Sequence, residues 1–215
     1  MRCMIETIKQ SLNSKIHPVN MSKLREHSIR EACRNRLRRQ FAGDQSTLIV
    51  EEFGVLGGQR RVDVAAINGH FHGYEIKSDL DNLERLAGQS EKYGLVFDYL
   101  TVICTEKYLA SADMILPQHW GLLKARETTK GRIVTNFVRR PKLNRATESV
   151  YVFHLLWKEE MVSVLEDIGA PSSLRGGSKQ AMAEYVSRNL AKSKISELVR
   201  GRLKVREGWR HPQLS

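Results

Sequence analysis

The spacing of apolar side chains predicts a helix over residues 22–41. Four apolar residues recur there at every fourth position: Ile29, Cys33, Leu37 and Phe41. This spacing places them in one line along a helix, so that one face packs against the rest of the molecule. Three arginines keep the same period one position later: Arg30, Arg34 and Arg38. We expect this basic line, beside the apolar one, to meet the phosphate groups of a nucleic acid.

Extended segments follow this helix, and two of them form a hairpin. Residues 47–53 are strand-like, and glycines at positions 54, 57 and 58 mark a turn after them. The stretch from residue 61 to residue 77 then has the pattern of two short strands joined at Asn68-Gly69.

After the hairpin, the sequence predicts further alternating helices and strands, and then helices alone. After Lys77, Ser78 or Asp79 can cap a helix that runs to about Tyr93, with a buried stripe of Leu80, Leu83 and Leu86. Further predicted elements are a buried strand over 99–105, a short helix over 107–114, weaker strands over 121–125 and 132–137, and helices over 150–168, 179–190 and 195–204. This order predicts an α/β fold with a mixed sheet flanked by helices and a helical C-terminal extension. We expect a core over residues 1–140 and a basic helical region over residues 141–215 that packs on it.

The chemistry of the hairpin points to a metal-dependent reaction. Asp63 lies on its first strand, and Glu75 and Lys77 are two residues apart on its second. Carboxylates suit a hard cation such as Mg²⁺ or Mn²⁺, which polarises a phosphate and lowers the pKa of its bound water, while a lysine offsets the developing charge. The same three residues could instead form a surface salt-bridge cluster worth under about 1 kcal/mol.

The loop of the hairpin decides whether these side chains can meet. A two-residue loop of Asn68 and Gly69 would turn Glu75 away from Asp63. A three-residue loop over 67–69 or 68–70 shifts the register by one and puts Asp63, Glu75 and Lys77 on one face, so we predict an odd loop or a bulge. The opposite face is apolar enough to pack on a helix and consists of Val62, Val64, Ala66, Tyr74 and Ile76.

Charge and composition favour a nucleic acid as partner. The chain of 215 residues carries a net charge of +11, and its flanks, residues 1–42 and 171–215, each hold ten Lys/Arg against three Glu. The segment between them is therefore net acidic, which suits a centre that holds cations between ends that hold a polyanion. No apolar run is long enough to span a membrane and the first residues lack a signal-peptide core, so we expect a cytoplasmic protein.

Isolated cysteines, histidines and tryptophans give weaker signals. Three scattered cysteines form no disulfide framework, and Cys33 and Cys104 are expected in the core. His70 and His72 lie near the hairpin tip, where solvation is expected, although the pair could also bind a metal. The three tryptophans are expected to pack rather than to stack on bases.

These motifs together resemble the PD-(D/E)XK nuclease superfamily, which has the restriction-endonuclease-like fold. Asp63 in Arg-Val-Asp-Val is followed by Glu75-Ile76-Lys77 on the next strand, and Gln89 and Tyr93 match the Gln-x-x-x-Tyr helix of the RecB-like branch. The chain is also similar over nearly its whole length to an uncharacterised bacterial family placed in this superfamily. That similarity rests on Gly73–Asp79, Arg85-Leu86, Gln89, Tyr93, Pro117-x-x-Trp-Gly121, Leu156-Trp157 and Trp209-Arg210.

The resemblance implies a role for each matched residue. Asp63, Glu75 and the carbonyl of Ile76 would bind the metal, and Lys77 would position the attacking water and stabilise the transition state. Gln89 and Tyr93 would orient the site or the substrate backbone. Superfamily members often add an acidic residue from the first helix or strand, and Glu31 or Glu52 would fill that place, with Glu52 preferred because it ends the strand beside Asp63.

Two functions follow as hypotheses. The first is a Mg²⁺- or Mn²⁺-dependent deoxyribonuclease in DNA repair, restriction or defence, with DNA as substrate ahead of RNA and contacts from Arg30, Arg34, Arg38 and Arg61. The second is a nucleic-acid-binding module of the same fold that does not cut, or that cuts only with a partner. A homodimer or an accessory protein is compatible with both. The complete set of Asp63, Glu75 and Lys77 favours the first, because a pure binder gains nothing from burying carboxylates near phosphate.

Overall fold

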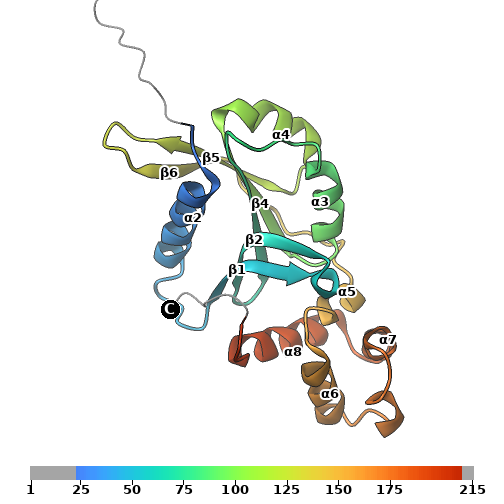
Figure 1. Ribbon diagram of the computed structural model, residues 1–215. Coiled ribbons are helices and arrows are strands. Elements are labelled where there is room, and N and C mark those ends of the chain that lie inside the picture. The colour runs from blue at the N-terminus through green and yellow to red at the C-terminus, as the bar shows by residue number, and fades with distance from the viewer. Residues whose placement is uncertain (1–22, 210–215) are drawn as a thin grey trace, which may run out of the picture.

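The computed structural model describes residues 23–209, which form an α/β fold around a six-stranded mixed sheet (Figure 1). The strands are β1 (Leu48–Val55), β2 (Arg60–Ile67), β3 (Phe71–Lys77), β4 (Tyr99–Thr105), β5 (Gly121–Glu127) and β6 (Ile133–Arg139). The α-helices within residues 23–209 are α2 (Glu26–Gln40), α3 (Leu86–Gly94), α4 (Leu109–Ile115), α5 (Ser149–Phe153), α6 (Lys158–Asp167), α7 (Lys179–Asn189) and α8 (Lys192–Val205). Single 3₁₀ turns occur at Leu56–Gly58, Glu106–Tyr108 and Ser172–Leu174. The predicted fold class is confirmed.

The sheet keeps the strands in chain order and changes direction twice. Strands β1, β2 and β3 are antiparallel, β3, β4 and β5 are parallel, and β6 returns antiparallel to β5. Parallel neighbours need a crossover connection, and α3 and α4 supply the two crossovers. Both the hairpin and the strands predicted over 99–105, 121–125 and 132–137 are confirmed.

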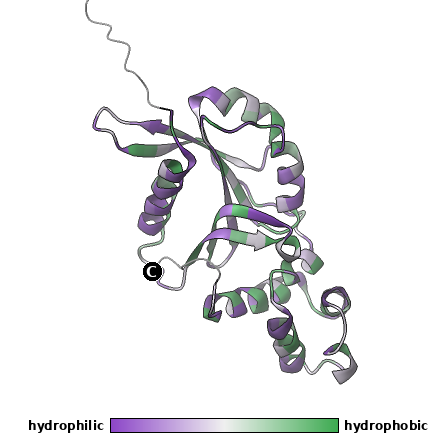
Figure 2. Cartoon of the chain, in the orientation of Figure 1, coloured by the Kyte–Doolittle hydropathy of each residue, from purple (hydrophilic) through white to green (hydrophobic). Residues whose placement is uncertain are grey.

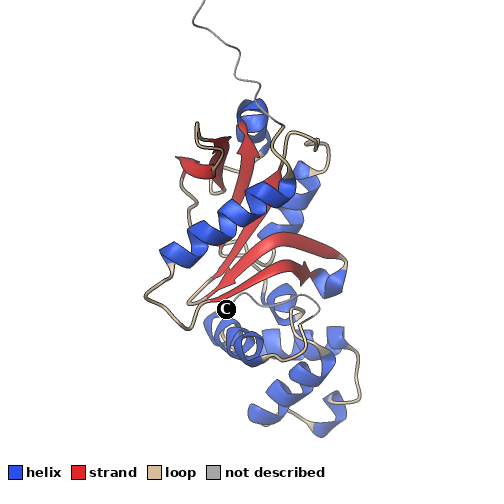
Figure 3. Ribbon diagram, turned by 60° about the vertical axis from the view of Figure 1, so that its left-hand side comes forward, coloured by secondary structure: helices blue, strands red, loops and turns tan. Residues whose placement is uncertain are grey.

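Helix α2 covers one face of the sheet, as its apolar line predicts. Ile29, Cys33 and Leu37 are fully buried in one cluster with apolar residues of strands β1 to β5, and Phe41 packs at the edge of this cluster. Figure 3 shows α2 crossing in front of the strands, and Figure 2 colours much of its outer surface hydrophilic. Cys33 and also Cys104 are free and buried, as expected of small core residues.

The opposite face of the sheet packs on α3, α4 and the C-terminal helices. Their apolar residues belong to one continuous cluster with those of the strands, and Trp120 lies fully buried within it. The C-terminal helices α5 to α8 also contact one another, at the end of the sheet where β1 lies (Figure 1). The boundary predicted after residue 140 falls between β6 and α5, and the division into two units stays a prediction.

Two helices differ from the sequence-based prediction. The helix expected from Ser78 or Asp79 begins only at Leu86, because Asp79 makes tertiary contacts instead: its carboxylate accepts hydrogen bonds from Leu24 N at 2.8 Å and from Thr105 Oγ1 at 2.6 Å. Leu80, which was expected to be buried, is 63% exposed.

The helix predicted over 150–168 is in fact two helices, α5 and α6. Leu155 and Leu156 turn into the core between them, and the Glu160 side chain accepts a hydrogen bond from Trp157 N at 2.6 Å at the start of α6. The helix predicted over 22–41 spans Glu26–Gln40, and Ser22 lies outside the described residues. None of the helices formed by residues 23–209 is long and apolar enough to cross a lipid bilayer.

Candidate metal and phosphodiester site

The hairpin that carries the candidate residues has a three-residue loop. Ile67 pairs with Phe71 and Val64 pairs with Tyr74, which leaves residues 68–70 as the loop. Asn68 closes it, since its side-chain oxygen accepts from His70 N at 2.9 Å. The predicted odd loop is therefore confirmed, and continuing the register sets Asp63 opposite Glu75.

The first two strands bend at the site. Glu52 has a φ of 51°, which is uncommon for a residue other than glycine, and it falls in β1 opposite Asp63. Beyond this bend Phe53 and Val62 turn to the face that packs on α3 and the C-terminal helices. The prediction that Val62 shares a face with Val64 is wrong: the alternation of sides along β2 is interrupted at Asp63, opposite the bend at Glu52.

Glu75, Lys77 and Gln89 form a compact, buried group. Lys77 Nζ donates to Glu75 Oε1 at 2.8 Å and to Gln89 Oε1 at 3.0 Å, and Gln89 Nε2 donates to Glu75 Oε1 at 2.6 Å. Glu75 and Lys77 are only 3% and 5% exposed. Strand β3 and helix α3 together hold these three side chains, and Tyr93 supports them one helical turn later, its hydroxyl donating to Arg61 O at 2.5 Å.

Close packing behind β3 fixes this group. A side chain at Gly73 would place its Cβ 2.8 Å from Leu100 Cδ2 and 3.1 Å from the ring of Phe97. A Cβ at this position would require Leu100 or Phe97 to shift, and glycine lets β3 lie this close without such a shift. The strand that presents Glu75 and Lys77 is thereby held against its parallel neighbour.

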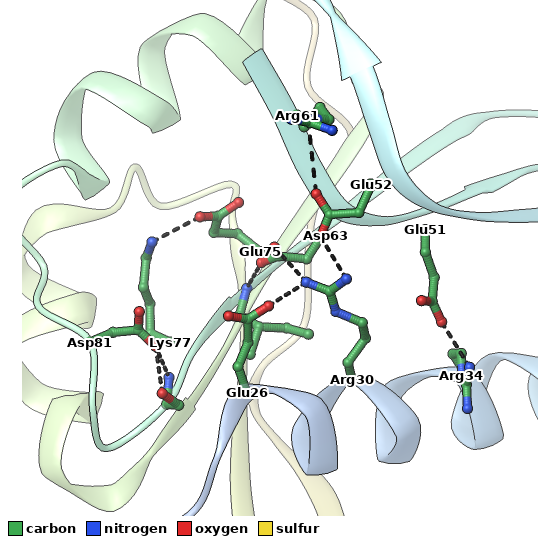
Figure 4. A network of polar contacts seen from close by, with 12 residues as sticks. Glu26, Arg30, Arg34, Glu51, Glu52, Arg61, Asp63, Glu75, Lys77 and Asp81 are labelled. Carbon is green, nitrogen blue, oxygen red and sulfur yellow. Dashed lines mark hydrogen bonds and ion pairs between the residues drawn. The ribbon is translucent and has the colours of Figure 1, made fainter. Parts of the chain in front are cut away.

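Asp63 lies where β2 separates from β3 and connects two groups of charges. Its Oδ2 accepts a hydrogen bond from Ile76 N at 2.6 Å. The side chain of Asp63 thus takes the place of a backbone acceptor for this N–H. Its Oδ1 lies 3.4 Å from Arg30 Nη2, and Arg30 Nη1 lies 2.6 Å from Glu52 Oε1. Asp63 therefore lies between the Glu75–Lys77 group and α2, rather than simply beside Lys77 on one face (Figure 4).

Three carboxylates surround the Arg30 guanidinium. Glu26, one helical turn before Arg30, pairs with it, and Glu26, Glu52 and Asp63 each have an oxygen within 4.8 Å of the others (Figure 4). This spacing is close enough for one cation to be shared by all three. In the structure the positive charge among them is that of Arg30.

The carboxylates of the site are buried at an electrostatic cost. Burial, followed by the negative charge of Glu75, raises the pKa of Asp63 well above its usual value. Burial also raises the pKa of Glu75, against the lowering effect of Lys77 and Gln89. Glu75 Oε2 is buried and has no hydrogen-bond partner in the part of the chain that the structure describes. A buried acceptor without a partner, beside a second carboxylate with a raised pKa, is the environment that a divalent cation stabilises.

The other predicted residues lie around this centre in different ways. Arg34 is turned toward the sheet and pairs with Glu51 at 3.0 Å, so that neither it nor Arg30 presents an unpaired guanidinium to solvent. Arg38 is exposed near the end of α2, and the Arg61 side chain is 58% exposed, with Nε 4.0 Å from Glu52. Glu31 is exposed, so that of the two acidic alternatives it is Glu52 that the structure brings to Asp63.

The histidines of the hairpin differ from each other. The His70 side chain is 50% exposed, as expected near a loop. His72 is instead half-buried, and its ring stacks on Tyr99 with centroids 5.0 Å apart and an interplanar angle of 15°. The expectation that His72 is solvated is therefore wrong. Burial lowers its pKa to about 4, which reflects this aromatic environment.

Sequence reasoning missed Glu26 as a member of the site. The signal was available, because Glu26 continues the line of Arg30, Arg34 and Arg38 by one turn toward the N-terminus. Glu31 lies outside that line. A glutamate at the start of a line of arginines has no obvious role in a basic surface, and its pairing with Arg30 shows that it belongs to the site.

Comparisons with known proteins identify a family. The sequence model of a family described as bacteriophage P4 protein cII matches residues 20–213. Protein cII of Enterobacteria phage P4 is 27% identical over 177 residues, which are 82% of this chain and 65% of that relative. The chain thus spans about 65% of the length of the curated relative that it matches.

One solved structure has a weaker similarity. It is the SPO1766 protein of unknown function from Silicibacter pomeroyi, with 18% identity and a TM-score of 0.38, over 77% of this chain and 88% of the other. A similarity at this level supports no conclusion about fold or function.

Proposed function

The chain belongs to the family of bacteriophage P4 protein cII, and we propose that it is a metal-dependent nuclease that hydrolyses phosphodiester bonds of DNA. The observation that carries the proposal is the buried Glu75–Lys77 pair on β3, with Asp63 bound to the backbone of the same strand at Ile76 N. These are the residues that resemble the PD-(D/E)XK motif. DNA repair, restriction or defence are the settings in which such an activity would operate.

The donor set fits a hard divalent cation. Asp63, Glu75 and the Ile76 carbonyl would hold Mg²⁺ or Mn²⁺, with Glu52 and Glu26 as further carboxylates beside Asp63. The Oε2 of Glu75 supports this fit, because it is a buried acceptor to which none of residues 23–209 donates a hydrogen bond. When bound, the cation would polarise the phosphate and lower the pKa of a coordinated water.

Lys77 is placed to stabilise charge on the reacting phosphate. Its ammonium is fixed by Glu75 Oε1 and Gln89 Oε1, so that its position is set before a substrate arrives. A preorganised cation in a site that excludes water stabilises developing negative charge more strongly than a mobile one. Gln89 orients both Glu75 and Lys77, and Tyr93 ties α3 to the backbone of β2.

One observation favours a second function, a DNA-binding module that does not cut. Arg30 already pairs with Glu26, Glu52 and Asp63, which is how a structural charge cluster would be arranged. In that case the carboxylates would stabilise the packing of α2 on the hairpin and would need no metal.

Calorimetric titration with Mn²⁺ and a cleavage assay on linear and supercoiled DNA separate the two functions. Asp63→Asn and Glu75→Gln preserve the shape of each side chain while removing its charge, and both should abolish metal binding and cleavage. Glu31→Gln is the matched control, since this exposed glutamate lies on the same helix as Glu26 and outside the site. Equal Mn²⁺ affinity in the wild type and in Asp63→Asn would refute the nuclease and leave the binding module.

A further inference from the structure

A pocket of about 370 Å³ opens beside the candidate site. Glu52 and Arg61 form its wall toward the site, and Gly57 and Gly58 of the turn after β1 form another wall. The far wall comes from the C-terminal region and includes Trp157, Lys179, Arg206 and Trp209. The pocket thus lies where β1 and the turn face the C-terminal helices (Figure 1).

The far wall is built around a stacked arginine. The guanidinium carbon of Arg206 lies 4.5 Å from the ring centroid of Trp157 and 4.6 Å from that of Trp209. Arg206 is held in turn by Glu160 Oε1 at 2.7 Å and by Leu155 O at 2.9 Å. Trp157 is therefore supported by Arg206 and is nevertheless 40% exposed, as a preformed aromatic surface at the pocket.

Two further cations line the same pocket. Lys179 Nζ donates to Leu156 O at 2.6 Å, and the Arg61 side chain is 58% exposed. Burial and then the charge of Arg206 lower the pKa of Lys179, while Glu160 and Glu159 act in the opposite direction. Arg61 and Lys179 both line the pocket, so an anion bound in it would be attracted by both cations.

We propose that this pocket receives one unpaired nucleotide of a DNA strand, with its base stacked on Trp157 and its phosphate directed to Arg61 and Lys179. The proposal rests on the nuclease function, because Glu52 and Arg61 are shared by the pocket and the site, so that the next phosphate along the strand would lie at Asp63. The volume is that of a small-ligand pocket, which accommodates a single nucleotide and excludes a duplex. Stacking on an aromatic ring suits any base and requires the base to be unpaired.

The test measures DNA binding without divalent metal, so that hydrolysis plays no part. Fluorescence anisotropy in EDTA compares a labelled oligo-dT strand, a blunt duplex of mixed sequence and free dTMP as competitor. Loss of the ring in Trp157→Ala should weaken strand binding on the order of tenfold and leave duplex binding unchanged. Trp157→Phe should retain most of the affinity. Val138→Ala, at an exposed apolar residue of β6, is the control and should bind both DNAs as the wild type does.

Each alternative result is informative. Trp157→Leu keeps apolar packing on Arg206 without a stacking ring, so it replaces the alanine variant if that one does not fold. Unchanged strand binding in both variants, or an equal loss for strand and duplex, would overturn the proposal. Competition by dTMP at the same concentration as the oligonucleotide would make the pocket a site for free nucleotides and would also overturn it. Failure of the nuclease function alone would appear differently, as strand binding that depends on Trp157 without cleavage in Mg²⁺.

Discussion

Replacing Arg30 by methionine tests whether the carboxylates around it form a metal site or a structural charge cluster. The substitution keeps the unbranched apolar part of the side chain while removing the guanidinium and its charge. It leaves Glu26, Glu52 and Asp63 close together without the guanidinium that pairs with all three. We expect the variant to be less stable than the wild type in EDTA and to gain more stability than the wild type when Mn²⁺ is added.

The size of the effect follows from the burial of the pairs. Removing one partner of a buried ion pair costs about 3–5 kcal/mol, because the other charge is left uncompensated. The side chains of Arg30, Glu52 and Asp63 are 17%, 28% and 19% exposed, so water screens part of the interaction. We therefore expect a loss of about 2–3 kcal/mol, which lowers Tm by about 4–12 °C in a chain of this length.

Metal binding should reverse this loss. In the wild type a cation must displace the guanidinium before it reaches the three carboxylates, and this displacement weakens its affinity. A tenfold lower Kd in the variant adds about 1.4 kcal/mol at saturating metal, or about 3–6 °C in Tm. Differential scanning calorimetry with and without Mn²⁺ measures both quantities on the same samples.

Arg34→Met is the matched control for this experiment. Arg34 lies one turn further along α2 and pairs with Glu51, at 26% and 20% exposure, outside the group of three carboxylates. The Arg34→Met variant should have a lower Tm than the wild type. Adding Mn²⁺ should raise its Tm by the same amount as it raises that of the wild type. The reasoning fails if Arg30→Met and Arg34→Met respond alike to Mn²⁺, since the charges around Arg30 would then have no special relation to a metal.

Three further predictions concern β3. Lys77→Ala should abolish cleavage in a gel assay while DNA affinity stays near that of the wild type, because Lys77 acts on the transition state. Cleavage at the wild-type rate would show that Lys77 has no part in the mechanism. Gly73→Ala should lower the free energy of unfolding in urea by about 1–3 kcal/mol, since the new Cβ would overlap Leu100 and Phe97; an unchanged midpoint would show that these side chains can move aside. His72 has its pKa lowered to about 4 from 6.5, so the unfolded chain takes up the proton first and stability should fall as the pH drops from about 6.5 toward 4. His72→Gln should remove this part of the pH dependence in thermal melts, and an identical slope in the variant would contradict the assignment.

Local patterns were sufficient to predict most of the sheet and the register of the hairpin. The parity argument needs only that directly paired residues share a face, and it correctly required an odd loop between Asp63 and Glu75. The apolar line of α2 also follows from spacing alone. Both features depend only on residues that are near one another in the chain, so the local spacing of residue types is enough to predict them.

Tertiary contacts account for what the sequence did not predict. Ser78 and Asp79 have the chemistry of a helix cap, yet the Asp79 carboxylate bonds to Leu24 N and to Thr105 Oγ1, on segments far away in the chain. These bonds satisfy Asp79 without a helix, and α3 begins seven residues later at Leu86. Here tertiary hydrogen bonds override the local helix propensity, and no local sequence pattern predicts these bonds.

The bend at Glu52 is the second feature that spacing could not supply. A φ of 51° is unfavourable for glutamate, and it persists because the strands on either side are fixed by their pairing. The bend brings Glu52 to Asp63 and turns Phe53 and Val62 to the opposite core. Strain of this kind is more often found at functional sites than elsewhere. Its position, between the Arg30 cluster and the pocket of Trp157, is therefore an argument for function that is independent of the PD-(D/E)XK resemblance.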